Sequence, residues 1–249
     1  MDGLTLEGRT ALVTGGAGGI GSAICRQLAA LGARVVIVDL NIAGARAIAA
    51  NLKEAAAYWV DLSEPASVEA LVENVKREVG RVDVLVNNAG WDKVEPFTQS
   101  HPATWDRLLN INLRGPIQLT HAFLGDMLAR QWGRLVYISS DAARVGSAGE
   151  SVYSACKAGL IGFSKTMARE ADRSQVTSNV VCPGPSDTPL LAEVARENPK
   201  LIEALKRGIP LGRLGHPDDI AGLVGFLTSE RAGYITGQTI SVSGGLTMI

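Results

Sequence analysis

The chain has 249 residues, of which 46% are hydrophobic and 20% are charged, and its formal net charge is −1. This composition is typical of a globular protein with a sizeable core, and it gives no electrostatic basis for binding nucleic acid or an anionic membrane. No apolar run approaches the roughly 18 residues of a membrane-spanning helix, and the acidic start lacks the apolar region of a signal peptide. Three widely spaced cysteines (Cys25, Cys156, Cys182) indicate free thiols without metal-ligand spacing, so we expect a cytoplasmic protein with no metal site.

Short apolar runs alternate with segments of helical periodicity along the chain. Runs of strand length lie at 11–13, 35–38, 82–86, 135–138, 176–182 and 239–242. Helical segments begin at Ile20, at a start signal formed by Ser63 with Pro65 in the first turn, and at about 104–130 and 151–171. This alternation predicts an α/β Rossmann fold, with a doubly wound parallel sheet and helices on both faces. Because no composition break marks a second domain, we expect a single catalytic domain over residues 1–249.

A glycine-rich turn joins the first predicted strand to the first predicted helix. Glycines let the backbone approach a pyrophosphate closely, and the helix N-terminus supplies free N–H groups with a partial positive charge. A glycine-rich turn alone is a weak signal, but a strand before it, a helix after it and an acid about twenty residues on strengthen it. We therefore predict that this turn binds a dinucleotide through Gly15, Gly18, Gly19, Ile20 and Gly21.

The acid that follows the second strand is Asp39, and Leu40 comes next. A carboxylate there can accept hydrogen bonds from the adenosine ribose, and at about 4 Å it would repel a 2′-phosphate by roughly 1–4 kcal/mol per unit charge. No Lys or Arg lies in the glycine turn to attract that phosphate. The sequence therefore predicts NAD rather than NADP as cofactor. The alternative is an acid that merely ends a strand.

Two further strand ends fit the same cofactor site. Asp61 and Leu62 follow the third strand, where an acid can meet the adenine edge. Asn88, Ala89 and Gly90 follow the fourth, where small residues let the backbone approach the cofactor. Ligands bind at the carboxyl ends of parallel strands in such sheets, so we assign all five residues to the NAD site.

Tyr153 and Lys157 are one helical turn apart, so their side chains share a face. Hydride exchange at a carbon–oxygen centre needs a proton donor or acceptor at the oxygen, and a free tyrosine titrates too high to be a base at neutral pH. A cation about 4 Å away at an effective dielectric near 20 contributes about 4 kcal/mol, or roughly three pKa units. We therefore expect Lys157 to lower the pKa of Tyr153, with the hydroxyl of Ser140 holding the substrate oxygen. A surface Tyr–Lys pair is the alternative.

Over essentially its whole length the chain resembles a single-domain short-chain dehydrogenase/reductase. The motifs that carry the resemblance are Thr14-Gly15-x-x-x-Gly19-x-Gly21, Asn88-Ala89-Gly90, Ser140, Tyr153-x-x-x-Lys157, Pro183-Gly184 and Gly244-Gly245. The resemblance implies that Ser140 orients the carbonyl, Tyr153 is the acid/base, and Lys157 binds the nicotinamide ribose. It further implies a homotetramer, and these roles at the remaining matched positions: Asn112 holding a proton-relay water, Thr188 contacting the nicotinamide carboxamide, and Pro183 and Gly184 at the cofactor.

Longer stretches resemble a narrower group, the 2-hydroxycyclohexane-1-carbonyl-CoA dehydrogenases of alicyclic and aromatic acid degradation. These stretches are 88–92 followed by Pro96-Phe97, 140–147, 181–185 and 209–215. The similarity implies oxidation of a β-hydroxyacyl-CoA to the β-ketoacyl-CoA with NAD. We expect a substrate lid at about 185–208 and substrate contacts from Trp91, Ser140, Asp141, Arg144, Leu190 and Leu191. A core or rim role for Trp91 and Arg144, and an ordinary amphipathic helix in place of the lid, are the alternatives.

Other functions are compatible with parts of this pattern. A related hydroxyacyl-CoA dehydrogenase, such as one acting on hydroxybenzylsuccinyl-CoA, or another alcohol dehydrogenase shares every motif. A 3-oxoacyl carrier-protein reductase shares the catalytic set but generally uses NADPH, against which Asp39 argues. A sugar epimerase needs a larger C-terminal substrate domain. A non-catalytic dinucleotide sensor has the same fold, but it has no need of Ser140, Tyr153 and Lys157 together.

Overall fold

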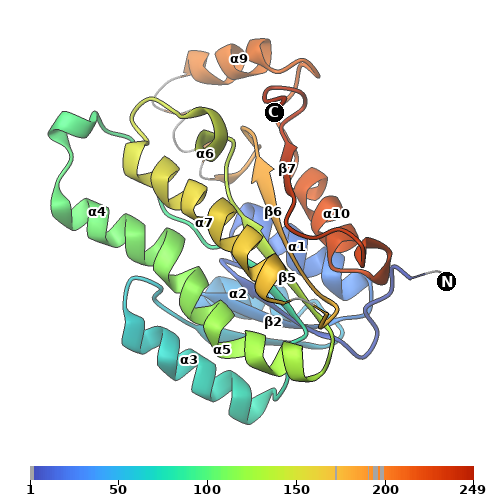
Figure 1. Cartoon of the computed structure of the whole chain (residues 1–249). Helices are drawn as coiled ribbons and strands as arrows, with labels where there is room; N and C mark the ends of the chain where they lie inside the picture. The colour runs from blue at the N-terminus through green and yellow to red at the C-terminus, as the bar shows by residue number, and fades with distance from the viewer. Residues whose placement is uncertain (1–2, 172, 190, 193–195, 197–198) are drawn as a thin grey trace.

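A computed structural model describes residues 3–171, 173–189, 191–192, 196 and 199–249 of the chain. A seven-stranded sheet runs through it in the order β3-β2-β1-β4-β5-β6-β7, with every neighbouring pair parallel (Figure 1). The strands are β1 (Thr10–Thr14), β2 (Arg34–Asp39), β3 (Ala55–Trp59), β4 (Val84–Asn87), β5 (Gly133–Ile138), β6 (Val176–Pro183) and β7 (Thr239–Val242). The expected doubly wound α/β fold is confirmed.

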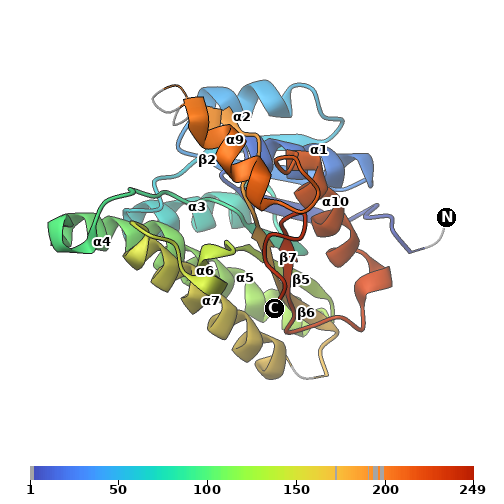
Figure 2. The ribbon, with the colours of Figure 1, turned by 90° about the horizontal axis from the view of Figure 1, so that it is seen from above.

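Helices cover both faces of the sheet, which explains why strand residues on both faces, such as the run 35–38 of β2, are apolar and buried (Figure 2). One face packs against α1 (Gly19–Ala30), α2 (Ile42–Ala49) and α10 (Pro217–Leu227). The other face packs against α3 (Pro65–Glu78), α5 (Gly115–Ala129) and α7 (Ser151–Glu170). In the described part of the chain, no helix has the length and apolar character needed to cross a membrane.

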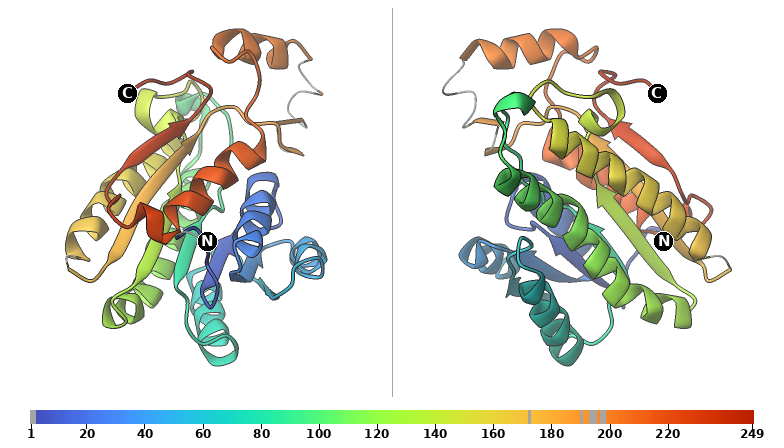
Figure 3. Two further views of the ribbon diagram at one scale, coloured as in Figure 1. Left: turned by 90° about the vertical axis from the view of Figure 1, so that its right-hand side faces the viewer. Right: turned by 60° about the vertical axis from the view of Figure 1, so that its left-hand side comes forward.

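The order of the strands reverses at β1, which pairs with β2 on one side and with β4 on the other. Connections that leave two neighbouring strands in opposite directions open a crevice at the carboxyl ends of those strands, where ligands bind in sheets of this type. The short helix α6 (Ala142–Val145) and the helix α9 (Pro199–Gly208) lie at this end of the sheet (Figure 3).

The helical stretch expected at 104–130 is divided in the structure. Helix α4 (Pro102–Leu109) and α5 are joined by a π-helical turn, η2 (Asn110–Arg114). Pro116 explains why the regular helix is interrupted here. Proline has no N–H to donate to the carbonyl of Asn112, and its ring clashes with that carbonyl in a regular helix. The N–H of Gly115 donates to the carbonyl of Asn110, one residue further back than in an α-helix.

Two other expectations about helices differ from the structure. Ser63 does not cap α3, whose N-cap is Glu64. The N–H and the hydroxyl of Ser63 instead donate to Oδ1 of Asp61 at 2.8 and 2.6 Å. Helix α10 was not expected, although its start carries a capping box in which His216 and Asp219 bond to each other's backbone N–H groups. Short 3-10 turns, η1 (Phe97–Gln99) and η3 (Glu230–Ala232), complete the described elements.

Candidate active site

The turn between β1 and α1 forms a cradle that only glycine fits. Gly15 adopts a φ of +64°, and a Cβ on Gly21 would lie 2.0 Å from the carbonyl oxygen of Gly15. The turn is fastened to the end of β4, because Nδ2 of Asn88 donates to the carbonyl oxygens of Thr14 (2.9 Å) and Gly15 (3.1 Å). Since Gly18 at the N-cap has no side chain, the first N–H groups of α1 have no side-chain cap and are suited to a pyrophosphate.

Asp39 connects this cradle to the end of β2. One of its carboxylate oxygens accepts the N–H of Ala17 at 2.9 Å, and the other accepts the N–H of Asn41 at 2.8 Å. Leu40 beside it is 57% exposed. Asp61 and the buried Leu62 follow β3 along the same edge of the sheet.

The end of β6 completes the cofactor edge. Pro183 is the last residue of β6, and the N–H of Gly184 donates to the carbonyl of Val242 at 3.0 Å. Thr188 lies against the start of α1, since a Cβ on Gly19 would be 3.1 Å from its methyl group. Leu191 donates its N–H to the Thr188 hydroxyl at 3.3 Å, whereas Leu190 lies outside the described residues.

Helix α7 brings Lys157 and Tyr153 to the same edge. Lys157 is only 3% exposed. Its ammonium donates to the carbonyl of Ile138 at 2.9 Å and lies 5.6 Å from the centre of the Tyr153 ring. A Cβ on Gly90 would be 3.2 Å from that ammonium and 3.1 Å from Oδ1 of Asn112. Three segments that are distant in sequence therefore meet around Gly90.

Asn112 lies in the π-helical turn with its side chain fully buried. Its Nδ2 donates to the carbonyl oxygens of Trp91 (2.7 Å) and Leu108 (3.1 Å), while its Oδ1 accepts the N–H of Trp91 at 3.2 Å. The amide thus holds the backbone that follows β4 in place. π-Helical turns are frequent at functional sites, and this one places Asn112 beside Gly90, which also borders the Lys157 ammonium.

The electrostatics of the pair differ from the sequence-based expectation. Burial lowers the pKa of Lys157 to about 8. Burial also raises the pKa of Tyr153, and the Asp92 and Glu150 carboxylates raise it further, while a hydrogen bond with Ser140 opposes them. A lowering by Lys157 was expected, but these effects outweigh any such contribution.

The expected substrate residues make contacts within the protein. Asp141 is buried and accepts the hydroxyl of Ser241, and Arg144 donates to that hydroxyl at 2.9 Å and to the backbone carbonyl of Ile249. The Trp91 ring is stacked by the Arg107 guanidinium, whose carbon lies 4.2 Å from the ring centre.

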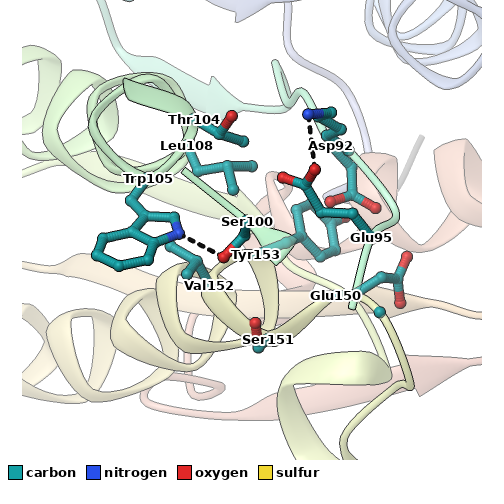
Figure 4. Close-up of a pocket in the computed structure, with 12 residues that line it drawn as sticks. Asp92, Glu95, Ser100, Thr104, Trp105, Leu108, Glu150, Ser151, Val152 and Tyr153 are labelled. Atoms are coloured by element: carbon teal, nitrogen blue, oxygen red, sulfur yellow. Dashed lines mark hydrogen bonds and ion pairs between the residues drawn. The ribbon is translucent and has the colours of Figure 1, made fainter. Parts of the chain in front are cut away.

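Three acids near Tyr153 gave no signal of their own in the sequence. Asp92, Glu95 and Glu150 line a pocket with Tyr153, as Figure 4 shows. Asp92 lies within a stretch that carried the narrower resemblance, but the other two belong to loops that only the fold brings together.

Comparisons with known proteins agree with this geometry. A family profile described as enoyl-(acyl carrier protein) reductase matches residues 15–247. The 3-oxoacyl-(acyl-carrier-protein) reductase FabG of Pseudomonas aeruginosa is 40% identical over 250 residues, covering 98% of this chain and 100% of the relative. The 2,3-dihydroxy-2,3-dihydro-p-cumate dehydrogenase of Pseudomonas putida F1 is 38% identical, covering 99% and 97%.

A solved structure of a candidate gluconate dehydrogenase from Agrobacterium tumefaciens superposes with a TM-score of 0.93 at 28% identity, covering 99% of both chains. The site and these relatives define an oxidoreductase that uses a nicotinamide dinucleotide. The chain belongs to the short-chain dehydrogenase/reductase family.

Replacing Gly21 by alanine should damage the cradle. Because the new Cβ would collide with the Gly15 carbonyl, we expect a dinucleotide dissociation constant raised at least 10-fold, measured by calorimetry. Gly125→Ala on α5 is the matched control, since its Cβ would meet no atom within 4 Å. Alanine there should leave dinucleotide binding unchanged and stabilise the helix by up to about 1 kcal/mol. Equal binding by both variants would contradict a tight cradle.

Replacing Lys157 by methionine should raise the pKa of Tyr153 further. The ammonium lies 5.6 Å from the centre of the Tyr153 ring, and one cation at about that distance from a phenolate contributes about 3 kcal/mol at an effective dielectric near 20, or about two pKa units. We expect kcat for alcohol oxidation at pH 7, where most of Lys157 is still charged, to fall about 100-fold and its pH profile to move to higher pH. Lys165→Met, an exposed lysine on the same helix, should leave the profile in place. An unshifted profile in the Lys157 variant would show that this cation does not act on Tyr153.

Proposed function

We propose that the protein is an NAD-dependent dehydrogenase that oxidises the secondary alcohol of a cyclic or aromatic β-hydroxyacyl-CoA, such as 2-hydroxycyclohexane-1-carbonyl-CoA, to the β-ketoacyl-CoA. Residues 1–249 act as one catalytic domain, with about 185–208 as its substrate lid. The observation that carries the proposal is the meeting of Tyr153 with a buried lysine and Ser140 at the carboxyl edge of the sheet, beside the glycine cradle.

The residues present fit a dinucleotide. The cradle of Gly15 and Gly21 has no room for side chains, and Asp39 is fixed by two backbone N–H groups at the end of β2. A negative charge there favours a ribose hydroxyl over a phosphate, which supports NAD. When bound, the dinucleotide supplies the hydride acceptor.

The protein's own groups handle the proton and the orientation of the alcohol. The Ser140 hydroxyl donates a hydrogen bond to the substrate oxygen, and the Tyr153 phenolate takes the hydroxyl proton as the carbon loses its hydride. The Lys157 ammonium favours the phenolate by charge. Because the Tyr153 pKa is raised by burial and by two acids, oxidation should be faster at alkaline pH, where the phenolate is more populated.

The names of the relatives support the class of substrate. FabG reduces, by name, a 3-oxoacyl group, which is the oxidised counterpart of a β-hydroxyacyl group. The p-cumate relative acts, by name, on a ring diol. A cavity beside α9 combines apolar and basic side chains, which suits an acyl chain on a phosphate-bearing carrier: Leu191, Ile202, Arg196, Lys206 and Arg213.

A second candidate is a 3-oxoacyl thioester reductase that works with NADPH. The 40% identity to FabG over nearly the whole chain favours it. The arrangement of Asp39 argues for the oxidative alternative, and the cofactor preference separates the two.

The family resemblance supports a homotetramer, with α4, α5 and α7 as interface elements. Leu109 and Ile117, on two of these elements, are 42% and 36% exposed in the single chain. Mass measurement in solution tests the assembly.

Cofactor preference tests the role of Asp39. We expect kcat/KM with NAD to exceed that with NADP by at least 10-fold. Asp39→Asn should raise the NADP-to-NAD ratio roughly 5- to 1,000-fold, because 1–4 kcal/mol of repulsion toward a 2′-phosphate is removed. Asp218→Asn, at an exposed acid of α10, is the control. A preference for NADPH by the unmodified enzyme would overturn the NAD assignment.

A panel of alcohols tests the substrate class. NAD reduction should be fastest with cyclic and aromatic β-hydroxyacyl-CoA thioesters, slower with short linear ones, and slowest with the free hydroxy acids. Tyr153→Phe should abolish turnover of every substrate while dinucleotide binding persists. Equal rates with thioesters and free alcohols would remove the CoA claim, and turnover by Tyr153→Phe would remove the assigned acid/base.

A further inference from the structure

The pocket in front of Tyr153 is strongly acidic on one side. Asp92, Glu95 and Glu150 converge there from two loops, and Trp105 and Leu108 of α4 contribute to the opposite wall (Figure 4). In the described part of the chain, no three acidic, histidine or cysteine side chains are placed to hold a metal ion. The acids therefore have to be understood by their effect on what approaches Tyr153.

The two loops that carry the acids are fixed to each other. The N–H of Glu95 donates to the carbonyl of Gly149 at 3.0 Å. Gly149 adopts a φ of +85°, and a Cβ on it would lie 2.8 Å from a methyl group of Val94. The same stretch is held at its start by the bonds between Asn112 and Trp91. The positions of the acids are therefore set by the fold.

The charge on this wall is only partly balanced. Lys93 pairs with Glu95 at 2.6 Å, and the charge of the buried Lys157 of α7 acts on Asp92, which also accepts a hydrogen bond from the backbone N–H of Lys93. Glu150 acts on both Asp92 and Tyr153, and among the described residues it forms no ion pair within 4 Å. One oxygen each of Asp92 and Glu95 is buried and accepts no hydrogen bond from the described protein.

We propose that Asp92, together with Glu150, is a specificity determinant that rejects substrates with a free carboxylate near the reacting carbon and admits those whose carboxyl group is masked as a neutral thioester. This inference rests on the proposed function and adds the feature that separates a β-hydroxy acid from its thioester. In a β-hydroxy acid a single carbon separates the carboxylate from the carbinol carbon, so the carboxylate comes within a few ångströms of Tyr153, and close to the acids around it, when the alcohol reaches Tyr153.

The state of Asp92 makes the rejection depend on pH. Burial is the larger cause and the neighbouring Glu150 carboxyl the next in raising the pKa of Asp92 to about 7. Above pH 7 Asp92 is ionised and repels a carboxylate, and below pH 7 it is protonated and the repulsion weakens. A substrate carboxylate stays ionised through this range, because its own pKa is near 4.

Reduction of acetoacetate and methyl acetoacetate with NADH tests the proposal. The two probes differ in one negative charge, and neither contains CoA, so phosphate recognition does not enter. The measured quantity is the acid-to-ester ratio of kcat/KM at pH 8, together with the same ratio of association constants for the enzyme–NADH complex. Taking a ratio cancels effects of a variant on Tyr153 that both probes share.

Asp92→Asn should raise the acid-to-ester ratio roughly 10- to 100-fold, the factor expected for removing one charge at several ångströms from the carboxylate. As pH falls from 8 to 6 the ratio should rise more steeply in the unmodified enzyme than in Asp92→Asn, where Lys157, with a pKa of about 8, still gains charge but Asp92 no longer loses it. Asp126→Asn, at an exposed acid of α5, should behave as the unmodified enzyme. Glu150→Gln gives the same test if Asp92→Asn does not fold.

An unchanged ratio in a folded Asp92→Asn or Glu150→Gln protein would overturn the proposal. So would a ratio that is already near one in the unmodified enzyme at pH 8. Failure of the proposed function has a different signature, namely no turnover of any CoA thioester or ester. The ratio of association constants still decides the role of the acids in that case.

Discussion

The geometry of the site depends on the burial of the Lys157 ammonium, which is unfavourable in free energy. Taking an ammonium out of water costs of the order of several kcal/mol, and the lowered pKa of this lysine is the expression of that cost. The fold holds the charge with the carbonyl of Ile138 at the end of β5, and the hydroxyl of Ser139 fixes the carbonyl of Lys157 itself. Gly90 contributes by having no side chain where the ammonium lies.

The reversal of strand order at β1 makes this arrangement possible. β1 and β4 are neighbours in the sheet, so the glycine cradle that follows β1 lies beside the segment that follows β4 and leads to Gly90. Asn88 and Ala89 bond to Thr14 between the two segments. The cofactor edge and the proton-transfer edge are therefore parts of one construction. A change at either strand end alters both.

The sequence predicts the fold well wherever one physical pattern dominates. The β-branched run 35–38 reads as a buried strand because both of its faces are covered, and Tyr153 and Lys157 share a face because one helical turn separates them. Prediction fails where distant segments decide. The π-helical turn results from Pro116 acting on the carbonyl of Asn112, and Ser63 bonds to Asp61 instead of capping a helix. The raised pKa of Tyr153 comes first from its burial and then from Asp92 and Glu150, and both its burial and the approach of Asp92 require the folded chain.

The π-helical turn at Asn110–Arg114 also limits how this protein can evolve. A π-helical turn contains one residue more than the α-helical turn it replaces, so deletion of one residue here would leave α4 and α5 in their present register. Leu119 and Phe123 of α5 could then keep their places in the core. The direction of Asn112 depends on the extra residue, so the deletion would cost its bonds to the backbone of Trp91. At this point the chain could lose a residue and keep its fold while losing the geometry of its site.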